Sequence, residues 1–283
     1  MTWRSLMADS FAELLERENR SPLKRAVGAI LSRSAIHVLR GWWYRWRFTH
    51  RPEQVRSHLK VIGHLVSPGD IVVDLGANIG QYTFLLSRLV GREGRVIAFE
   101  PVQSTHELLS RNLRAHRVVN ADLRKCAISS QRGTATMEIP RFAWGGDAHY
   151  LAHIVSAPSI SEMVESVPCD TVDGALGEFF AKVTFVKCDI EGHEVACLQG
   201  ASRFLRSTPA AWLMEVAAAE RPGSQSEAFD IMRSFGYTPW TLEGNSLVAC
   251  RTARKTSDVF FFLPSHLMLL AHRDPMLLQS VAC

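Results

Sequence analysis

Apolar runs and amphipathic stretches alternate along most of the chain after residue 50. Runs of consecutive apolar residues predict buried strands, and apolar residues spaced three or four apart predict the helices that cover them. We expect strands at 71–74, 95–100, 121–128, 183–189 and 211–216, and helices at 55–65, 82–90, 104–116, 194–205 and 226–235. This alternation predicts an α/β fold, in which helices cover both faces of a doubly wound, mostly parallel sheet.

The remaining segments predict shorter elements and the limits of the domain. Residues 133–139 predict an added β element, and residues 140–166 predict a long loop, which is usually a lid, a binding loop or a disordered segment. Further short elements are expected as strands at 167–171, 237–242, 246–250 and 259–263 and as a helix at 177–181. We therefore expect a helical extension over 1–50, one domain over 51–265 and a tail over 266–283.

Two of the predicted strands end in a carboxylate. The first strand ends in Asp74 and is followed by a turn that contains Gly76 and Gly80, while the second strand ends in Glu100. Ligands of such folds bind at the carboxyl ends of the parallel strands. One carboxylate accepts hydrogen bonds from both hydroxyls of a ribose, and another attracts a cation. The pair predicts a nucleoside ligand that also carries a positive group.

The spacing of the glycines separates the nucleotide classes. Dinucleotide folds use G-x-G-x-x-G, in which the middle glycine lets the backbone approach a pyrophosphate. Here Asn78 occupies the middle position, and no phosphate-binding lysine follows the turn. The pattern D-x-G-x-x-x-G looks like the first motif of class I S-adenosylmethionine (SAM) methyltransferases. SAM has no phosphate, and its ammonium and sulfonium groups suit an acid such as Asp74.

A cluster of polar residues follows the predicted strand 183–189. Asp189, Glu191, His193 and Glu194 lie within six positions of one another. The helix dipole favours acids in a first helical turn, which accounts for Glu191 and Glu194 without any function. It accounts less well for the whole cluster at the carboxyl end of a strand, so this block is the second strong signal of the chain.

Together these blocks resemble the FkbM family of SAM-dependent methyltransferases. The family pattern is D-x-G-A-N-x-G-x-x-T, A-F-E-P, K-x-D-x-E-G-x-E and L-x-G-A, which matches here at 74–83, 98–101, 187–194 and 198–201. The resemblance covers about residues 55–265. It has one departure, because the family often carries a second acid after the position of Asp173, where this chain has Gly174.

The resemblance implies a class I, Rossmann-like methyltransferase fold that transfers a methyl group from SAM to a hydroxyl of a sugar, glycan or polyketide-type small molecule. We assign the cofactor contacts to Asp74 at the cation, Gly76, Asn78 and Gly80 at the methionine end, Glu100 at the ribose, and Ala127 and Ile128 at the adenine. An alcohol is a poor nucleophile at neutral pH, so a general base is expected.

Three residues are candidates for this base, namely Asp189, Glu191 and His193. Of these, His193 has the ordinary pKa nearest to neutrality. We expect no required metal, because Glu215 and Val216 stand where Mg²⁺-dependent O-methyltransferases carry an Asp-Asn pair.

Charge is distributed unevenly along the 283 residues. Residues 1–60 hold 12 Lys and Arg against 5 Asp and Glu, whereas the rest of the chain holds 20 against 23. The slightly acidic body argues against a nucleic-acid substrate. Segment 36–48 mixes arginine with Trp42, Trp43 and Trp46. It is a candidate for peripheral membrane contact, and a helix packed on the domain is the simpler explanation.

The six cysteines form no C-x-x-C pair and no zinc spacing with histidine, so we expect a reducing, cytoplasmic location. The chain has no uninterrupted apolar run of about 18 residues, so we expect no spanning helix. Two other interpretations stay open: a nicotinamide-dependent oxidoreductase on a related fold, and a SAM-binding protein without catalysis. The oligomeric state and the identity of the acceptor are not predicted.

Overall fold

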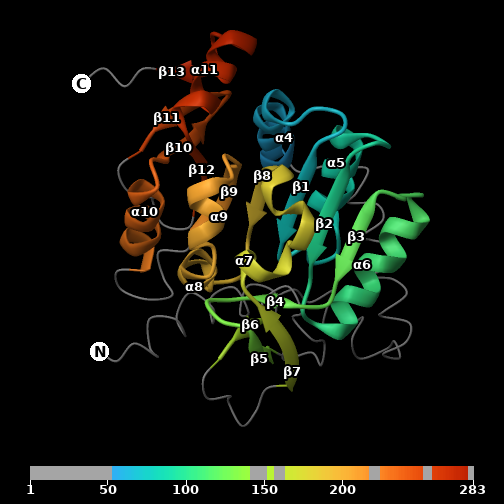
Figure 1. Ribbon diagram of the computed structural model, residues 1–283. Coiled ribbons are helices and arrows are strands. Elements are labelled where there is room, and N and C mark those ends of the chain that lie inside the picture. The colour runs from blue at the N-terminus through green and yellow to red at the C-terminus, as the bar shows by residue number, and fades with distance from the viewer. Residues whose placement is uncertain (1–52, 141–151, 156–162, 217–223, 251–256, 280–283) are drawn as a thin grey trace, which may run out of the picture.

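The computed structural model describes residues 53–140, 152–155, 163–216, 224–250 and 257–279. Within these ranges the chain forms one sheet of nine strands and a second sheet of four (Figure 1). In their order across the large sheet, the strands are β13 (Leu278–Gln279), β11 (Ser246–Ala249), β10 (Thr238–Glu243), β12 (Ser257–Phe262), β9 (Ala211–Val216), β8 (Val183–Cys188), β1 (Ile71–Leu75), β2 (Arg95–Phe99) and β3 (Ala121–Arg124).

The large sheet is parallel on one side and mixed on the other. Strands β3, β2, β1, β8 and β9 run parallel to one another. Strand β12 is antiparallel to both β9 and β10, and β11 is antiparallel to β10. The expected α/β fold is confirmed. The expected helical extension over residues 1–50 lies outside the described residues.

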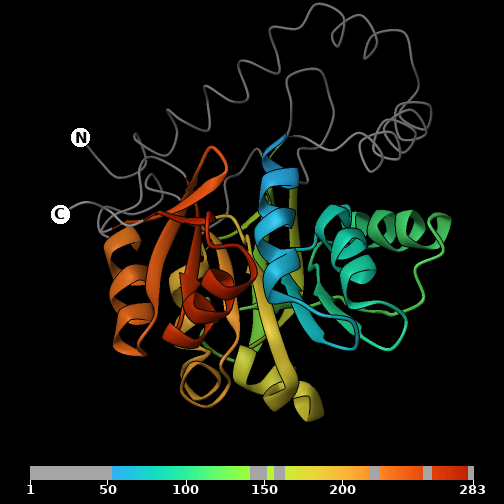
Figure 2. The same ribbon diagram turned by 90° about the horizontal axis from the view of Figure 1, so that it is seen from above.

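Helices cover both faces of this sheet because neighbouring residues of each buried strand point to opposite sides. Val72 and Val96 pack with α4, α5 and α11, whereas Val73 and Ile97 pack with α8, α9 and α10. Figure 2 shows α4 and α11 side by side on the first face. The helices are α4 (Glu53–Leu65), α5 (Gln81–Val90), α6 (Gln103–Ala115), α7 (Val172–Ala175), the 3₁₀ helix η2 (Gly177–Lys182), α8 (Glu194–Gln199), α9 (Ser202–Ser207), α10 (Ser224–Ser234) and α11 (Pro264–Arg273).

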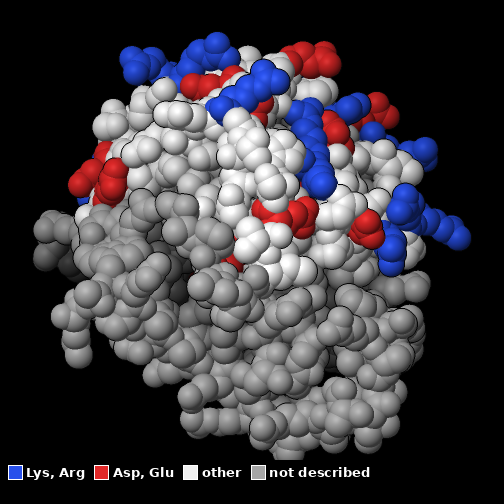
Figure 3. All heavy atoms as spheres, turned by 90° about the horizontal axis from the view of Figure 1, so that it is seen from below, with Lys and Arg blue, Asp and Glu red and all other residues white. Residues whose placement is uncertain are grey.

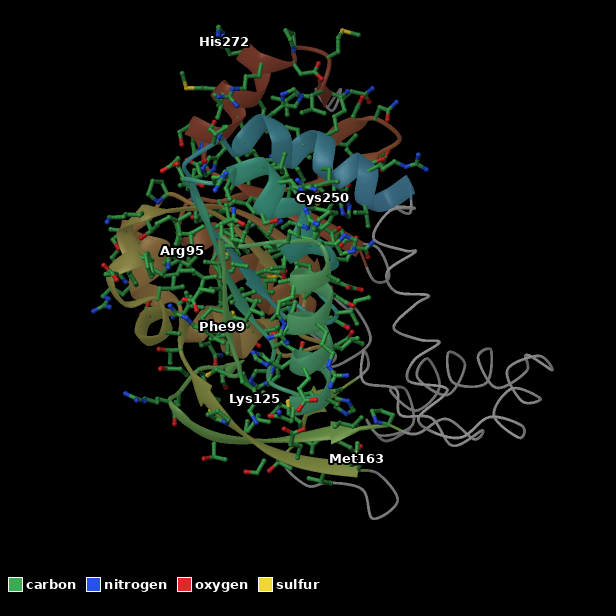
Figure 4. The ribbon with its side chains drawn as sticks, turned by 90° about the vertical axis from the view of Figure 1, so that its right-hand side faces the viewer. Arg95, Phe99, Lys125, Met163, Cys250 and His272 are labelled. Carbon is green, nitrogen blue, oxygen red and sulfur yellow. The ribbon has the colours of Figure 1, made fainter. Side chains whose placement is uncertain are left out.

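The second sheet lies beyond the carboxyl ends of the parallel strands. Its strands, in their order across it, are β4 (Ala127–Ile128), β7 (Met163–Asp170), β5 (Gly133–Ile139) and β6 (His153–Ile154). Arg95 and Phe99 are the first and last residues of β2, and Met163 belongs to the second sheet. In Figure 4, Arg95, Phe99, Lys125 and Met163 follow one another in this order, so the carboxyl end of β2 faces the second sheet. The second sheet thereby forms a cover over the edge where ligands of α/β folds bind.

Three elements differ from their predictions. The strand expected at 121–128 is divided, because its first half pairs with β2 and its second half pairs with β7. The helix expected at 194–205 is broken at Gly200, where a Cβ would clash with the backbone oxygen of Ser129. Helix α6 begins at Gln103, one residue before its predicted start, and its N-cap residue Val102 makes no side-chain cap. The backbone N–H of Gln103 donates instead to Glu165 of β7.

The C-terminal segment belongs to the large sheet rather than to a separate tail. Helix α11 packs on α4, and Arg273 donates to the backbone oxygen of His64 at 3.0 Å. Strand β13 then pairs with β11 through Leu278 and Leu247. The expected boundary at residue 265 therefore falls inside packed structure.

The described surface carries both signs of charge. Figure 3 views the end of the molecule that carries the second sheet, and on its described part Lys and Arg lie among Asp and Glu. In the described ranges, no helix is both long enough and apolar enough to cross a membrane.

Candidate active site

An open pocket lies between the carboxyl ends of the parallel strands and the second sheet. It encloses roughly 600 Å³, a volume that includes its solvent-open mouth. The second sheet contributes the apolar side chains Met137, Ala152 and Ile154 to its wall. Eight of the ten residues singled out from the sequence line it: Gly76, Asn78, Glu100, Ala127, Ile128, Asp189, Glu191 and His193.

Glu100 joins two of the loops that border the pocket. Its Oε2 accepts a hydrogen bond from the backbone N–H of Asn78 at 2.9 Å, and its Oε1 accepts one from Val102 at 3.1 Å. The residue is only 6% exposed. Burial raises the pKa of Glu100 to about 7, against the opposing effect of the two N–H donors. Because each carboxylate oxygen accepts more than one hydrogen bond, Glu100 keeps capacity for a ligand.

Asp74 and Gly80 do not line the pocket; Asp74 stands in β1 two residues before the pocket-lining Gly76 and is not exposed at all. Its Oδ2 accepts a hydrogen bond from the Thr83 hydroxyl at 2.6 Å, while its Oδ1 has no protein partner. Burial raises the pKa of Asp74, and the Lys187 ammonium opposes that shift. A buried carboxylate oxygen without a partner is unusual in folded proteins. It fits a ligand that brings a positive group to this end of the pocket.

The two glycines of the first turn are required by its geometry. Gly76 has φ 75° and Gly80 has φ 94°, a region that side chains other than glycine rarely adopt. A Cβ on Gly76 would collide with the backbone oxygen of Asp189, and one on Gly80 would lie 2.5 Å from Leu109. Gly76 thus lets the loops after β1 and β8 meet at the pocket wall, and Gly80 starts α5.

Asp189 is held by a buried lysine. Lys187 is 5% exposed and its Nζ lies 2.7 Å from Oδ2 of Asp189, whose side chain is 30% exposed. Burial alone would raise the pKa of Asp189, but the Lys187 ammonium outweighs it and holds this pKa below its usual range. Asp189 therefore presents a charged carboxylate to the pocket.

The turn after Asp189 is closed by Glu194. Its Oε1 accepts hydrogen bonds from the backbone N–H groups of Gly192 at 3.1 Å and Ile190 at 3.4 Å. Glu191, with φ 50°, and Gly192, with φ 87°, both have left-handed backbone. Such strain in a residue other than glycine costs about 1–3 kcal/mol and concentrates at functional sites. The turn directs Glu191 and His193 to the pocket wall.

His193 contacts the second sheet. Its Nε2 lies 2.8 Å from the hydroxyl oxygen of Ser129. Ser129 directly follows Ala127 and Ile128, the residues assigned to the adenine. The structure therefore brings His193 next to the expected nucleoside end of the pocket.

The model of the methyltransferase FkbM domain matches residues 74–239, which is more than half of the chain. The chain belongs to the FkbM family of SAM-dependent methyltransferases. The resemblance stated from the four sequence blocks is thus confirmed, and the chain is a methyltransferase.

Relatives of the FkbM chain were found among curated proteins and solved structures. The hexuronic acid methyltransferase AglP of Haloferax volcanii is 28% identical over 191 residues, which are 66% of this chain and 72% of AglP. The structure of the methyltransferase FkbM from Methylobacillus flagellatus has a TM-score of 0.47 and a sequence identity of 18%. The match covers 68% of this chain and 43% of the Methylobacillus flagellatus chain. This chain thus spans less than half the length of that protein. A putative rRNA-methylase from Clostridium thermocellum has a TM-score of 0.48 at 12% identity, over 75% and 94% of the two chains.

The family departure at Gly174 has a structural counterpart. Asp173, the acid that this FkbM chain retains, accepts hydrogen bonds from the backbone N–H groups of Arg203 at 2.9 Å and Phe204 at 2.7 Å. It thereby caps the start of α9 from outside the helix. A Cβ on Gly174 would lie 2.6 Å from Oδ1 of Asp170. In this chain the Asp173 position therefore stabilises the fold.

Five polar residues beside Asp189 were assigned no role from the sequence. They come from five different strands and helices and are His58, Tyr82, Lys187, Glu215 and Asp258. Two of them could have been noticed in the sequence, because the charged residues Lys187 and Glu215 interrupt the apolar runs of β8 and β9. Within the described residues, no group of three or more His, Cys, Asp or Glu is arranged to hold a metal ion.

Proposed function

We propose that this FkbM methyltransferase binds SAM in the pocket and methylates an oxygen of a sugar or glycan. The observation that carries the proposal is the partnerless Oδ1 of buried Asp74, which stands two residues before the pocket-lining Gly76, together with Glu100 in the pocket wall. These are the two carboxylates that a ligand with a cationic amino acid end and a ribose requires. When bound, SAM supplies an electrophilic methyl group on a sulfonium.

The residues divide the pocket into two ends. Asp74, Gly76 and Asn78 hold the methionine end, with Gly80 fixing the turn. Glu100 binds the ribose hydroxyls, while Ala127 and Ile128 cover the adenine. Met137 and Ile154 exclude water from the nucleoside end. This arrangement leaves Asp189 and Glu191 nearest to the methionine end, where the reacting hydroxyl must approach.

The acceptor class rests on the relative from Haloferax volcanii, whose name describes methylation of a hexuronic acid. A uronic acid offers hydroxyl and carboxylate oxygens. The carboxylates of Asp189 and Glu191 would repel an anionic group, so we assign the transfer to a hydroxyl. A polyketide-type hydroxyl is the second candidate acceptor. Asp189 takes the hydroxyl proton, and Glu191 and His193 are the other candidates for this step.

Nucleic acid is not proposed as the acceptor, because the described face around the second sheet mixes both signs of charge. Five described cysteines are free thiols. They are compatible with a reducing compartment, and we propose a cytoplasmic location. Contact of residues 36–48 with a membrane stays a prediction, since they lie outside the described residues.

Transfer of a labelled methyl group tests the proposal. The full-length protein is incubated with SAM labelled on its methyl group and a panel of uronic acid glycosides, neutral sugar glycosides and polyketide alcohols. We expect label in at least one sugar-type product, and at least about tenfold less with Asp189→Asn, given that a general base contributes ~10²–10⁴-fold. Label only in polyketide alcohols would reject the sugar assignment. Absence of SAM binding, combined with binding of NADH, would favour an oxidoreductase.

A further inference from the structure

Two carboxyl groups meet at the carboxyl ends of β8 and β9. Asp189 follows β8, and Glu215 lies in β9. The two strands run parallel with Cys188 opposite Met214, so Asp189 and Glu215 come next on the two neighbouring strands. Two neighbouring carboxylates repel each other, which favours a pair that holds one proton and one negative charge.

Lysine and acid neighbours decide which member is charged. Lys187 Nζ lies 2.7 Å from Oδ2 of Asp189, which favours the charged form of Asp189. Glu215 is directly opposite Asp258 in the antiparallel pair of β9 and β12, so a second acid faces it. A like charge disfavours ionisation of Glu215. The proton of the pair accordingly resides on Glu215.

A histidine and a tyrosine complete the surroundings of the pair. His58 of α4 lies with Nε2 3.6 Å from Oδ2 of Asp258 and with Nδ1 2.7 Å from the hydroxyl of Tyr82. Lys187 Nζ lies 5.0 Å from the centre of the Tyr82 ring. Asp258 is 20% exposed. The strand registers thus place Asp189, Glu215 and the partly exposed Asp258 next to one another on three neighbouring strands.

We propose that Asp189 and Glu215 act as one base for the acceptor hydroxyl, with Glu215 as a positioning residue that keeps a shared proton on the side away from the pocket. The inference rests on the proposed function, since it names the group that receives the proton in that reaction. Asp189 touches the acceptor, and Glu215 acts through Asp189. Nothing in the sequence pattern alone assigns Glu215 this role.

The step balances in atoms and electrons. The acceptor O–H bond breaks, and its proton moves to Asp189. The acceptor oxygen forms a bond to the methyl carbon, while the electron pair of the broken carbon–sulfur bond stays on sulfur. The pair then holds two protons, and one leaves through Asp258 to water. The products are the methyl ether, S-adenosylhomocysteine and one released proton.

The ionisation of Glu215 agrees with this geometry. The charge of Asp189, together with burial, raises the pKa of Glu215 to about 9. The titratable groups that face the pair from all elements packed around it are Asp74 (β1), Tyr82 (α5), Lys187 (β8), Glu194 (α8), Asp258 (β12) and His58 (α4). Lys187 opposes the shift of Glu215, and Asp258 adds to it.

Infrared spectroscopy of the ligand-free, full-length protein tests the shared proton. At pH 8, Glu100 and Glu194, with pKa values of about 7, are mostly ionised, whereas Glu215 still carries its proton. We expect a carboxylic acid carbonyl band at pH 8 that disappears on titration through about pH 9. The band should be lost in Glu215→Gln and should remain in Glu215→Asp. It should also remain in the control Glu227→Gln, because Glu227 is an exposed carboxylate on α10. A wild-type spectrum without this band, or one that Glu215→Gln leaves unchanged, would overturn the inference.

Two further measurements separate this inference from the proposed function. SAM titration should give the same affinity, within about twofold, for wild type and Glu215→Gln, whose folding is checked by circular dichroism. With a sugar acceptor, Glu215→Gln should lower kcat at least about tenfold and remove the alkaline limb of its pH profile, and Glu215→Asp should restore part of both. No SAM binding by wild type would reject the proposed function and leave the infrared result standing. Unchanged kcat in a SAM-binding Glu215→Gln variant would reject the inference alone.

Discussion

The carboxylate of Glu100 accepts the backbone N–H of Asn78 at 2.9 Å, across the gap between the loops after β1 and β2. Asn78 has left-handed backbone, with φ 50°. The hydrogen bond therefore stabilises a strained turn and at the same time orients the carboxylate that we propose binds the ribose of SAM. The turn and the proposed cofactor site depend on the same contact.

Glu100→Gln should weaken both SAM binding and the stability of the fold. The amide turns a donor toward one of the two backbone N–H groups, and an unsatisfied buried donor costs about 1–3 kcal/mol. We expect SAM affinity at least about tenfold weaker and a lower midpoint of urea unfolding. Glu107→Gln, on the exposed face of α6, is the matched control. Wild-type SAM affinity in Glu100→Gln would remove Glu100 from the cofactor site.

Gly76→Ala should destabilise the protein strongly. The left-handed backbone alone costs about 1–2 kcal/mol for a residue with a Cβ, and this Cβ collides with the Asp189 backbone oxygen. We expect a loss of more than about 3 kcal/mol in the free energy of unfolding. Gly63→Ala is the control, because Gly63 lies in α4 with nothing within 4 Å of a Cβ. It should stabilise the protein by up to about 1 kcal/mol. Equal stability of the two variants would contradict the structure of the turn.

His193→Ala distinguishes two roles for this histidine. Its contact with Ser129 favours the nucleoside end of the pocket. We expect SAM affinity about tenfold weaker, with kcat at saturating SAM within about threefold of wild type. Ser129→Ala should produce a smaller effect in the same direction. The opposite pattern, a large loss of kcat with unchanged SAM affinity, would support His193 as the base.

Stability of the ligand-free protein should fall between pH 7 and 8.5. Folded Glu215 retains its proton up to a pKa of about 9, whereas a glutamate in the unfolded chain has lost it above about pH 5. The folded state then binds more protons than the unfolded state, so its stability decreases as pH rises. Urea unfolding of wild type, Glu215→Gln and the control Glu227→Gln at several pH values measures this slope. Glu215→Gln should flatten it, and an equal slope in all three proteins would place the titrating group elsewhere.

Much of the site follows from the sequence because its residues end consecutive strands. Asp74, Glu100 and Asp189 each close an apolar run, and parallel strands bring their carboxyl ends to one edge. Strand β5 also has the predicted bounds, because Gly133–Ile139 alternates in the way an exposed hairpin strand does. Local pattern is sufficient where an element is specified by its own residues.

Other features depend on contacts between distant segments. Strand β4 exists only because Ala127 and Ile128 pair with residues about 40 positions later in β7. The start of α6 depends on β7, because Glu165 accepts a hydrogen bond from the backbone N–H of Gln103. His58, Glu215 and Asp258 meet because β12 inserts beside β9 and α4 covers both. The order of strands in the sheet is not encoded in any local pattern, so this cluster was not predicted.

The most direct test of the account is calorimetric titration of SAM into wild type and Asp74→Asn, with NADH as a control ligand. We expect micromolar SAM binding to wild type, at least about tenfold weaker binding to Asp74→Asn, and no NADH binding. Removing the charge leaves the ligand cation without its partner, and tenfold corresponds to about 1.4 kcal/mol. Absence of SAM binding to wild type, or equal binding to both proteins, would contradict the assignment of Asp74 and of the pocket above it.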